Sequence, residues 1–350
     1  MKKLIFILLF LGSAALCPGQ DKGLRIWPDT PTDWSGYQVV EPSREEPSFT
    51  SFTLYKEKKS FRKDGINYSY IDVTAAIRPA QSWVRSDAMT EAELSSVRRD
   101  FDLLEFFALQ YRDALLTTQD KDGFLMIEYT RQFEDARERV RKGADLSAYS
   151  LPAAPFDITQ LAWIRSDRSS GVFLGLGTRI PFGSLTRMIS PAIGLDFGFE
   201  RRWGRNAFLL GGTAGIHFLT YRYFDITGAW NNQHQTPSFA ISAGYGRDLF
   251  STEELRLSVH AGPAFGGYVF STNGAMGVLA GGPGLSEGLC LDYVISRSIS
   301  FSGRSPEYSD TSLRFRLYSD QIWILGQNYF LPTLNLSVGI HFDSRLLSKR

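Results

Sequence analysis

Apolar and polar residues alternate strictly in several parts of the second half of the chain. In residues 334–342 every even position is apolar and every odd position is small or polar. Successive side chains of a β-strand point to opposite faces, so this segment has one apolar and one polar face. The same alternation occurs in 193–200 and 255–262. A water-soluble sandwich would show it too, and only its recurrence along the chain favours one architecture over another.

Segments of about ten alternating residues separated by turns are typical of transmembrane β-barrels. We therefore predict an eight-stranded antiparallel transmembrane β-barrel in residues 165–342. Eight strands enclose only enough space for side chains, so we do not expect a pore. The predicted strands are 171–182, 191–202, 206–221, 238–249, 254–268, 287–297, 311–319 and 333–342, with a tail at 343–350.

The predicted connections alternate in length. The short ones at 203–205 and 250–253 suit periplasmic turns, and the long ones suit extracellular loops (223–237, 269–286, 320–332). Two connections break this rule, because the outer one at 183–190 is short and the inner one at 298–310 is long.

Several conspicuous residues fall in these connections. Gly277–Gly284 is expected to be a flexible loop, since it lacks the Gly-Lys-Ser/Thr and the following helix of a phosphate loop. His234 is expected to be solvated in an outer loop. Tyr308, Asp310 and Arg297 are expected to be turn residues.

The polar faces of these strands would line the barrel interior. A network of ion pairs filling the lumen is the favoured interpretation, because buried charges must be paired. The alternative is a small active site in the barrel, although no pair is singled out by its spacing. The predicted interior residues are Asp196, Glu200, His217, Arg256, His260, Asp292, Arg314, Arg316 and His341, with Arg179 near them.

The first twenty residues have the pattern of a secretion signal. Lys2 and Lys3 precede a short apolar core and a small-residue region, and that core is too short to span a bilayer. Leu16 stands where lipidation of Cys17 would call for a small residue, so we expect cleavage near Gln20 instead. Cys290 then has no disulfide partner within the chain.

Residues 21–156 are predicted to form an α+β domain in the periplasm, with a linker at 157–164. Strands are expected at 49–56 and 67–77, with a turn at Gly65. Helices are expected at 90–118, where Thr90 and Glu93 suggest a capping box, and at 123–142.

Several short motifs follow one another along this domain. Together they resemble a family of secreted bacterial domains related to zinc peptidases: Trp27-Pro28, Asp33–Tyr37, Ile71–Ala75, Ser82–Val84 and Asp100–Glu105. The resemblance implies a His-Glu-x-x-His metal motif, but the aligned positions read Ser96-Val97-Arg98-Arg99-Asp100. All four histidines of the chain lie beyond residue 156, so we expect no metal or other cofactor and a catalytically inactive relative.

Composition adds little about function. The formal net charge is +1 with mixed signs throughout, which gives no reason to expect a nucleic-acid partner. The barrel, closing on aromatic Phe342, resembles outer-membrane barrels of Gram-negative, Bacteroidetes-like bacteria. We expect a non-enzymatic protein in contact with outer-membrane lipid, whose periplasmic domain binds another envelope component. The alternatives are a lipid- or envelope-modifying enzyme, and a soluble lipocalin-like carrier with polar outer faces.

Overall fold

The computed structural model describes residues 23–153, 156–183, 186, 189–218, 224–225, 228–229, 235–272, 275–301, 305–323 and 330–349. They form two compact units. The helical unit comprises the described residues of Met1–Glu57, Asp72–Asp113 and Asp120–Ala154. The barrel unit comprises those of Lys58–Ile71, Ala114–Gln119 and Pro155–Arg350. Two segments that we predicted within the N-terminal domain, 58–71 and 114–119, therefore belong to the barrel unit. The predicted signal peptide, Cys17 and His234 lie outside the described residues.

The helical unit contains two long helices, α1 (Glu91–Leu115) and α2 (Phe124–Arg141), near the two predicted spans. The Thr90 hydroxyl accepts a hydrogen bond from the Glu93 amide (3.3 Å), as the predicted cap requires. A small sheet has the order β2-β6-β3, and β1 pairs with β5. Neither described helix is long and apolar enough to cross a membrane. The remaining elements here are β1 (Arg25–Ile26), β2 (Gln38–Val40), β3 (Ser48–Phe49), η1 (Pro79–Gln81), β6 (Trp83–Arg85) and η2 (Leu146–Tyr149). Two strands, β4 (Phe52–Lys63) and β5 (Ile66–Ile77), belong partly to this unit and partly to the barrel unit.

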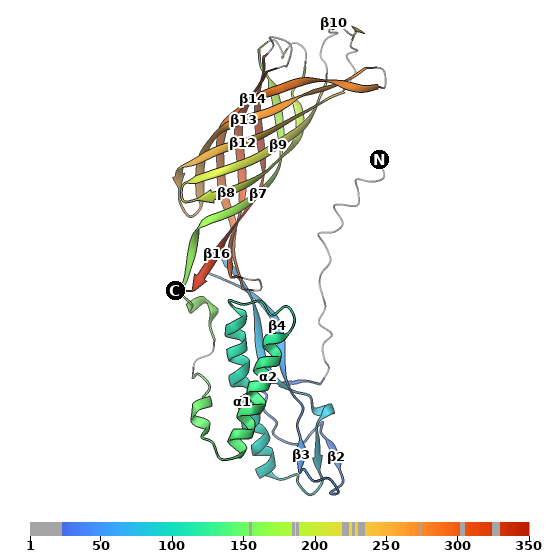
Figure 1. Ribbon diagram of the computed structural model, residues 1–350, viewed down its shortest axis with the longest axis vertical. Coiled ribbons are helices and arrows are strands. Elements are labelled where there is room, and N and C mark those ends of the chain that lie inside the picture. The colour runs from blue at the N-terminus through green and yellow to red at the C-terminus, as the bar shows by residue number, and fades with distance from the viewer. Residues whose placement is uncertain are drawn as a thin grey trace. The chain divides into compact units, whose positions relative to one another are not determined.

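The barrel unit is built on eight antiparallel strands, each paired with the next in the chain, and the last pairs with the first to close the barrel (Figure 1). A helical turn, η3 (Ile158–Gln160), precedes them, and β10 (Phe224–Asp225) pairs with β11 (Gly228–Ala229) separately. The barrel strands are β7 (Trp163–Pro181), β8 (Ala192–Trp203), β9 (Asn206–Phe218), β12 (Gln235–Ser251), β13 (Leu255–Thr272), β14 (Ala275–Ser300), β15 (Glu307–Trp323) and β16 (Phe330–Lys349).

The pairing register fixes the stagger of the barrel. A row of directly paired residues begins at Ser170 on β7 and returns to β7 at Ile180, ten residues further along. With a rise of about 3.3 Å per residue and about 4.8 Å between strands, eight strands staggered by ten residues tilt by about 41°. This geometry gives a narrow lumen that side chains fill.

The two faces of the wall have opposite character. On β8 the side chains of Ile193, Leu195 and Phe197 are 79%, 54% and 49% exposed on the outer face, whereas Asp196 and Glu200 are buried on the inner face. Exposed large apolar residues recur on the outer face of every barrel strand. A soluble carrier would have polar outer faces instead. The lipocalin-like alternative predicts such faces, and this prediction is wrong.

The strands are longer than predicted, and this overturns several expectations. β16 continues through the predicted tail to Lys349. Arg297 lies in β14, and Tyr308 and Asp310 lie in β15, so none of the three is a turn residue. The inner connection between these strands shrinks to 301–306, in line with the rule for periplasmic turns.

The glycine-rich stretch Gly277–Gly284 is also part of β14, not a loop. It pairs with β13 in a hairpin that extends to Thr272 and Ala275. A Cβ atom at Gly281 would lie 2.2 Å from the Gly266 carbonyl oxygen, so the close backbone approach explains the glycine. Flexible loops and closely packed strands both favour glycine, and composition alone could not separate them.

A short extension of the barrel wall, which we call the stem, lies beyond the first residue of β13, Leu255. There, residues Ile66–Ser69 of β5 run parallel to Arg297–Ser300 of β14. The Asn67 amide donates to the Ser296 hydroxyl (3.2 Å) and to the Arg297 carbonyl oxygen (3.3 Å). The stem has a small apolar core made of Tyr70, Leu116, Ile158, Ile299, Phe301, Tyr308 and Leu347.

Candidate functional site: the polar interior of the barrel

The structure places all nine predicted interior residues on the inner face of the barrel wall, and Arg256 is the least buried of them. Five of the nine come together near the end of the barrel with the short turns: Glu200, Arg256, Asp292, Arg314 and His341. The other four lie in separate contacts further along the lumen.

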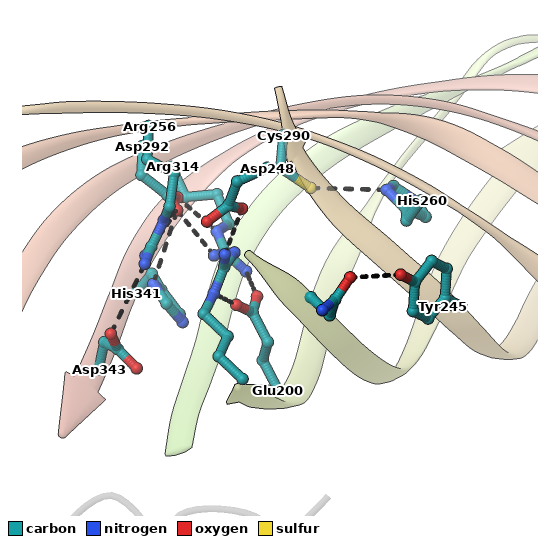
Figure 2. Close-up of polar contacts among 12 residues, drawn as sticks. Glu200, Tyr245, Asp248, Arg256, His260, Cys290, Asp292, Arg314, His341 and Asp343 are labelled. Atoms are coloured by element: carbon teal, nitrogen blue, oxygen red, sulfur yellow. Dashed lines mark hydrogen bonds and ion pairs between the residues drawn. The ribbon is translucent and has the colours of Figure 1, made fainter. Parts of the chain in front are cut away.

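Arg314 is the centre of this end cluster (Figure 2). Its Nε and Nη2 donate to the two carboxylate oxygens of Asp292 (2.5 and 2.8 Å), and its Nη1 donates to Glu200 (2.8 Å). Asp292 also accepts from Arg256 (3.0 and 3.1 Å). Charges in such a buried site are stable only when they are paired and hydrogen-bonded in this way.

Three further charged residues extend the cluster. Arg202 pairs with both Glu200 and Asp248, and its Nη1 lies 2.5 Å from Asp248 Oδ1. Asp343 Oδ2 lies 3.6 Å from Arg256 Nη1. Acidic and basic groups therefore alternate across the lumen and offset one another.

His341 packs against this cluster without a hydrogen bond from either ring nitrogen to a described residue. Its Nδ1 lies 4.0 Å from Asp292 Oδ2, and the ring is fully buried. The imidazole therefore fills space between charged groups.

The middle of the lumen holds two smaller contacts. Arg316 Nη1 donates to Asp196 (2.6 Å), whose other oxygen accepts from the Ser337 hydroxyl (2.5 Å). Cys290 Sγ lies 3.7 Å from His260 Nδ1, and the thiol is fully buried. Together they extend the polar interior of the barrel from the end cluster toward the opposite end.

Closer to the other end, His217 and Ser238 form a second contact between a base and a nucleophile, in addition to that of His260 with Cys290. His217 Nδ1 lies 2.7 Å from the Ser190 carbonyl, which can only accept, so Nδ1 carries the proton and Nε2 accepts from Ser238 Oγ at 2.9 Å. However, Arg179 also donates to that hydroxyl (3.3 Å), and both members of the pair are buried. A cavity of about 10 Å³ borders Arg179, which is the space of about one water molecule.

Sequence reasoning missed Arg202, Asp248, Asp320 and Asp343, which the structure buries in the lumen. Asp320 contacts Arg179 (3.6 Å) and Asn335 (2.9 Å). The signal was the same two-residue period, which already covered Arg202 and Asp248 within the predicted strands and reaches Asp320 and Asp343 just past the predicted strand ends. It places Asp343 on the same face as His341, for example.

The helical unit offers buried acids but no metal site. Among its described residues no three His, Cys, Asp or Glu side chains are grouped to hold a metal ion. At the positions aligned with the metal motif, Asp100 is buried and accepts from Arg137 on α2 (2.6 Å). Glu105 accepts from the Ala75 amide (2.7 Å), and burial raises the pKa of its carboxyl group to about 7.

Comparison with known proteins gave only distant structural similarities. No family model and no curated protein matches the chain. The barrel is similar to Neisserial surface protein A (TM-score 0.32, 10% identity, 51% of this chain and 97% of that one). It is also similar to OprG from Pseudomonas aeruginosa (TM-score 0.31, 10% identity, 51% of this chain and 96% of that one). A third similar structure is that of Ail from Yersinia pestis, solved with the heparin analogue sucrose octasulfate (TM-score 0.30, 9% identity, 50% of this chain and 98% of that one). At these TM-scores the similarities carry no argument about function.

Proposed function

We propose that the protein is a non-enzymatic outer-membrane β-barrel whose N-terminal residues 21–156, apart from 58–71 and 114–119, form an α+β domain in the periplasm. In this proposal the barrel anchors a domain that binds or organises another component of the cell envelope. The observation that supports it best is the apolar outer face of a closed barrel whose interior charges are paired.

The exposed apolar side chains argue for a lipid environment. Monomeric soluble proteins rarely expose contiguous apolar patches above a few hundred Å². Here exposed Leu, Ile, Val and Phe side chains occur on all eight strands, and in water each would forgo part of the about 1.5–3 kcal/mol that full burial contributes. A bilayer removes that cost. Closure of the sheet satisfies the backbone groups that lipid cannot hydrogen-bond.

The filled interior argues against transport as the main activity. Side chains of Arg314, Arg316 and Arg179 reach across the lumen at successive levels and are held by buried carboxylates. Opening a path would separate several of these ion pairs at once. Anchoring requires only that the barrel be stable, which such a network provides.

For the N-terminal domain, the altered metal motif supports a binding role over catalysis. Where the resemblance implies a histidine, Asp100 stands in a pair with Arg137, so the buried carboxylate is already neutralised by an arginine instead of a metal ion. A domain of this kind can still bind a partner through its surface although it lacks the metal ligands for catalysis.

The proposal is tested with the full chain in Gram-negative cells. A protease added to intact cells should leave residues 21–156 uncut, and the same protease should cut them once the outer membrane is permeabilised. Photo-crosslinking residues on the exposed faces of α1 and α2 should then capture a discrete envelope partner. Cleavage in intact cells would place the domain outside and overturn its periplasmic role.

A second candidate function rests on the His217–Ser238 contact, which would suit a lipid-modifying enzyme acting within the barrel. It is tested by comparing the lipids of outer membranes that contain the wild type or Ser238→Ala. A lipid product that forms with the wild type and disappears with the variant would favour the enzyme. Identical lipid profiles would remove it.

A further inference from the structure

A cluster of polar residues lies on the outer face of β14 and β15, among apolar neighbours. Glu287 pairs in register with Ser319, and Leu285 pairs with Gln321, so these side chains share one face of the wall. The Gln321 amide donates to Glu287 Oε1 at 3.1 Å. Glu287 is exposed, and Leu285, Leu289 and Leu317 around it are also exposed.

The position of Glu287 along the barrel is set by its own strand. It lies six positions before Tyr293, an exposed aromatic near the end with the short turns. A rise of about 3.3 Å per residue and a tilt of about 41° place Glu287 about 15 Å further along the barrel axis. The apolar band of an outer-membrane barrel is about 25 Å tall. If the barrel spans a membrane as proposed above, this carboxyl group lies at the depth of the acyl chains.

A carboxyl group at that depth needs hydrogen-bond donors that lipid does not supply. Acyl chains carry no donor, and charged groups inside a membrane normally pair with one another or face a polar cavity. The buried acids of the lumen follow this rule, since Asp292 and Asp196 each have an arginine. Among the described residues, Glu287 has the Gln321 amide, which leaves its second oxygen to be satisfied by another protein surface.

We propose that this face of the barrel binds a second copy of the chain. The cluster is self-complementary, because it offers a carboxyl acceptor together with amide and hydroxyl donors. Around a two-fold axis, Glu287 of one copy can accept from Gln321 or Ser319 of the other, and the reverse contact forms at the same time. Interhelical hydrogen bonds and small residues stabilise contacts between membrane proteins in the same way.

The residues around the cluster would allow the walls of two barrels to approach closely. Small side chains flank Glu287 on both neighbouring strands, Ala261 on β13 and Ser319 on β15. Beside them, the outer face has a hollow of about 610 Å³ that can receive apolar side chains of the partner. Its lining includes Leu257, Leu289, Leu291, Phe315, Leu317 and Leu336.

The contact is tested by cross-linking the full chain in isolated outer membranes. Ala261→Cys introduces an exposed thiol beside the cluster. Leu195→Cys introduces a control thiol on the outer face of β8, while the native Cys290 is fully buried. A short bismaleimide should give a covalent dimer with Ala261→Cys and at least tenfold less with Leu195→Cys. Adding Glu287→Leu should remove that dimer, whereas Glu287→Gln should retain it because the amide can still hydrogen-bond.

Equal cross-linking of the two cysteine variants, or a dimer that survives Glu287→Leu, would overturn the contact. Capture of a different polypeptide would also overturn it, because the partner would not be a second copy. The heat-dependent gel shift of a folded barrel is scored on the same samples. Its loss would overturn the proposed membrane barrel and this contact with it, whereas a retained shift without dimers would overturn the contact alone.

Discussion

Replacing Arg314 by methionine tests whether the ion pairs of the lumen hold the barrel together. Methionine keeps much of the side-chain volume but removes three hydrogen bonds of 2.5, 2.8 and 2.8 Å to Asp292 and Glu200. Removing one partner of a buried ion pair costs about 3–5 kcal/mol. Arg256 stays beside Asp292, so we expect the lower end, about 3 kcal/mol. That corresponds to more than a hundredfold in the folding equilibrium.

The assay is reversible urea unfolding of the full chain in lipid vesicles, followed by tryptophan fluorescence. Arg247→Met is the matched control, because this arginine is exposed on the outer face of β12, and it should change stability by less than about 0.5 kcal/mol. Adding Asp292→Asn to Arg314→Met removes one of the two carboxylates left behind and should restore part of the loss, with a coupling of about 0.5–3 kcal/mol. Equal, small effects of Arg314→Met and Arg247→Met would refute the reasoning.

Three other predictions concern single residues. Because burial raises the pKa of Glu105 to about 7, its folded form binds a proton that the unfolded chain loses above about pH 4.5. The stability of the helices should therefore fall between about pH 4.5 and 7 and then level off, and Glu105→Gln should remove this slope in urea titrations followed by circular dichroism at 222 nm. Gly171→Ala places a Cβ 2.3 Å from the His341 ring and should cost about 1–3 kcal/mol in the vesicle assay, against less for Gly198→Ala, whose nearest contact is 3.2 Å. Phe301→Ala empties the core of the stem and should cost about 3–5 kcal/mol locally, seen as faster hydrogen exchange in β5; unchanged exchange would contradict that packing.

The positions of the barrel strands were predictable because a half-buried strand must alternate, and its period needs no tertiary information. The alternation of Asp196 and Glu200 with apolar residues is an example. Strand ends were not predictable in the same way. Past Asp343 the adjacent Leu346 and Leu347 put an apolar residue on each face, so this end of β16 carries no alternating signal although it stays paired to Lys349.

The pairing of interior residues could not be deduced from the sequence. Arg314 contacts Glu200, 114 positions away, because the stagger of a closed barrel brings β8 and β15 to one level. The stem was missed for a similar reason. The parallel pairing of Ile66 with Arg297 joins two segments far apart in the sequence, which local patterns do not reveal.

The most direct test of the central claim is the migration of the full chain from isolated outer membranes on a gel, with and without boiling. A closed eight-stranded barrel in lipid resists the detergent until heated, so the account predicts a band in the outer-membrane fraction whose mobility changes on boiling. A protein found in the soluble periplasmic fraction, with the same mobility before and after boiling, would contradict it.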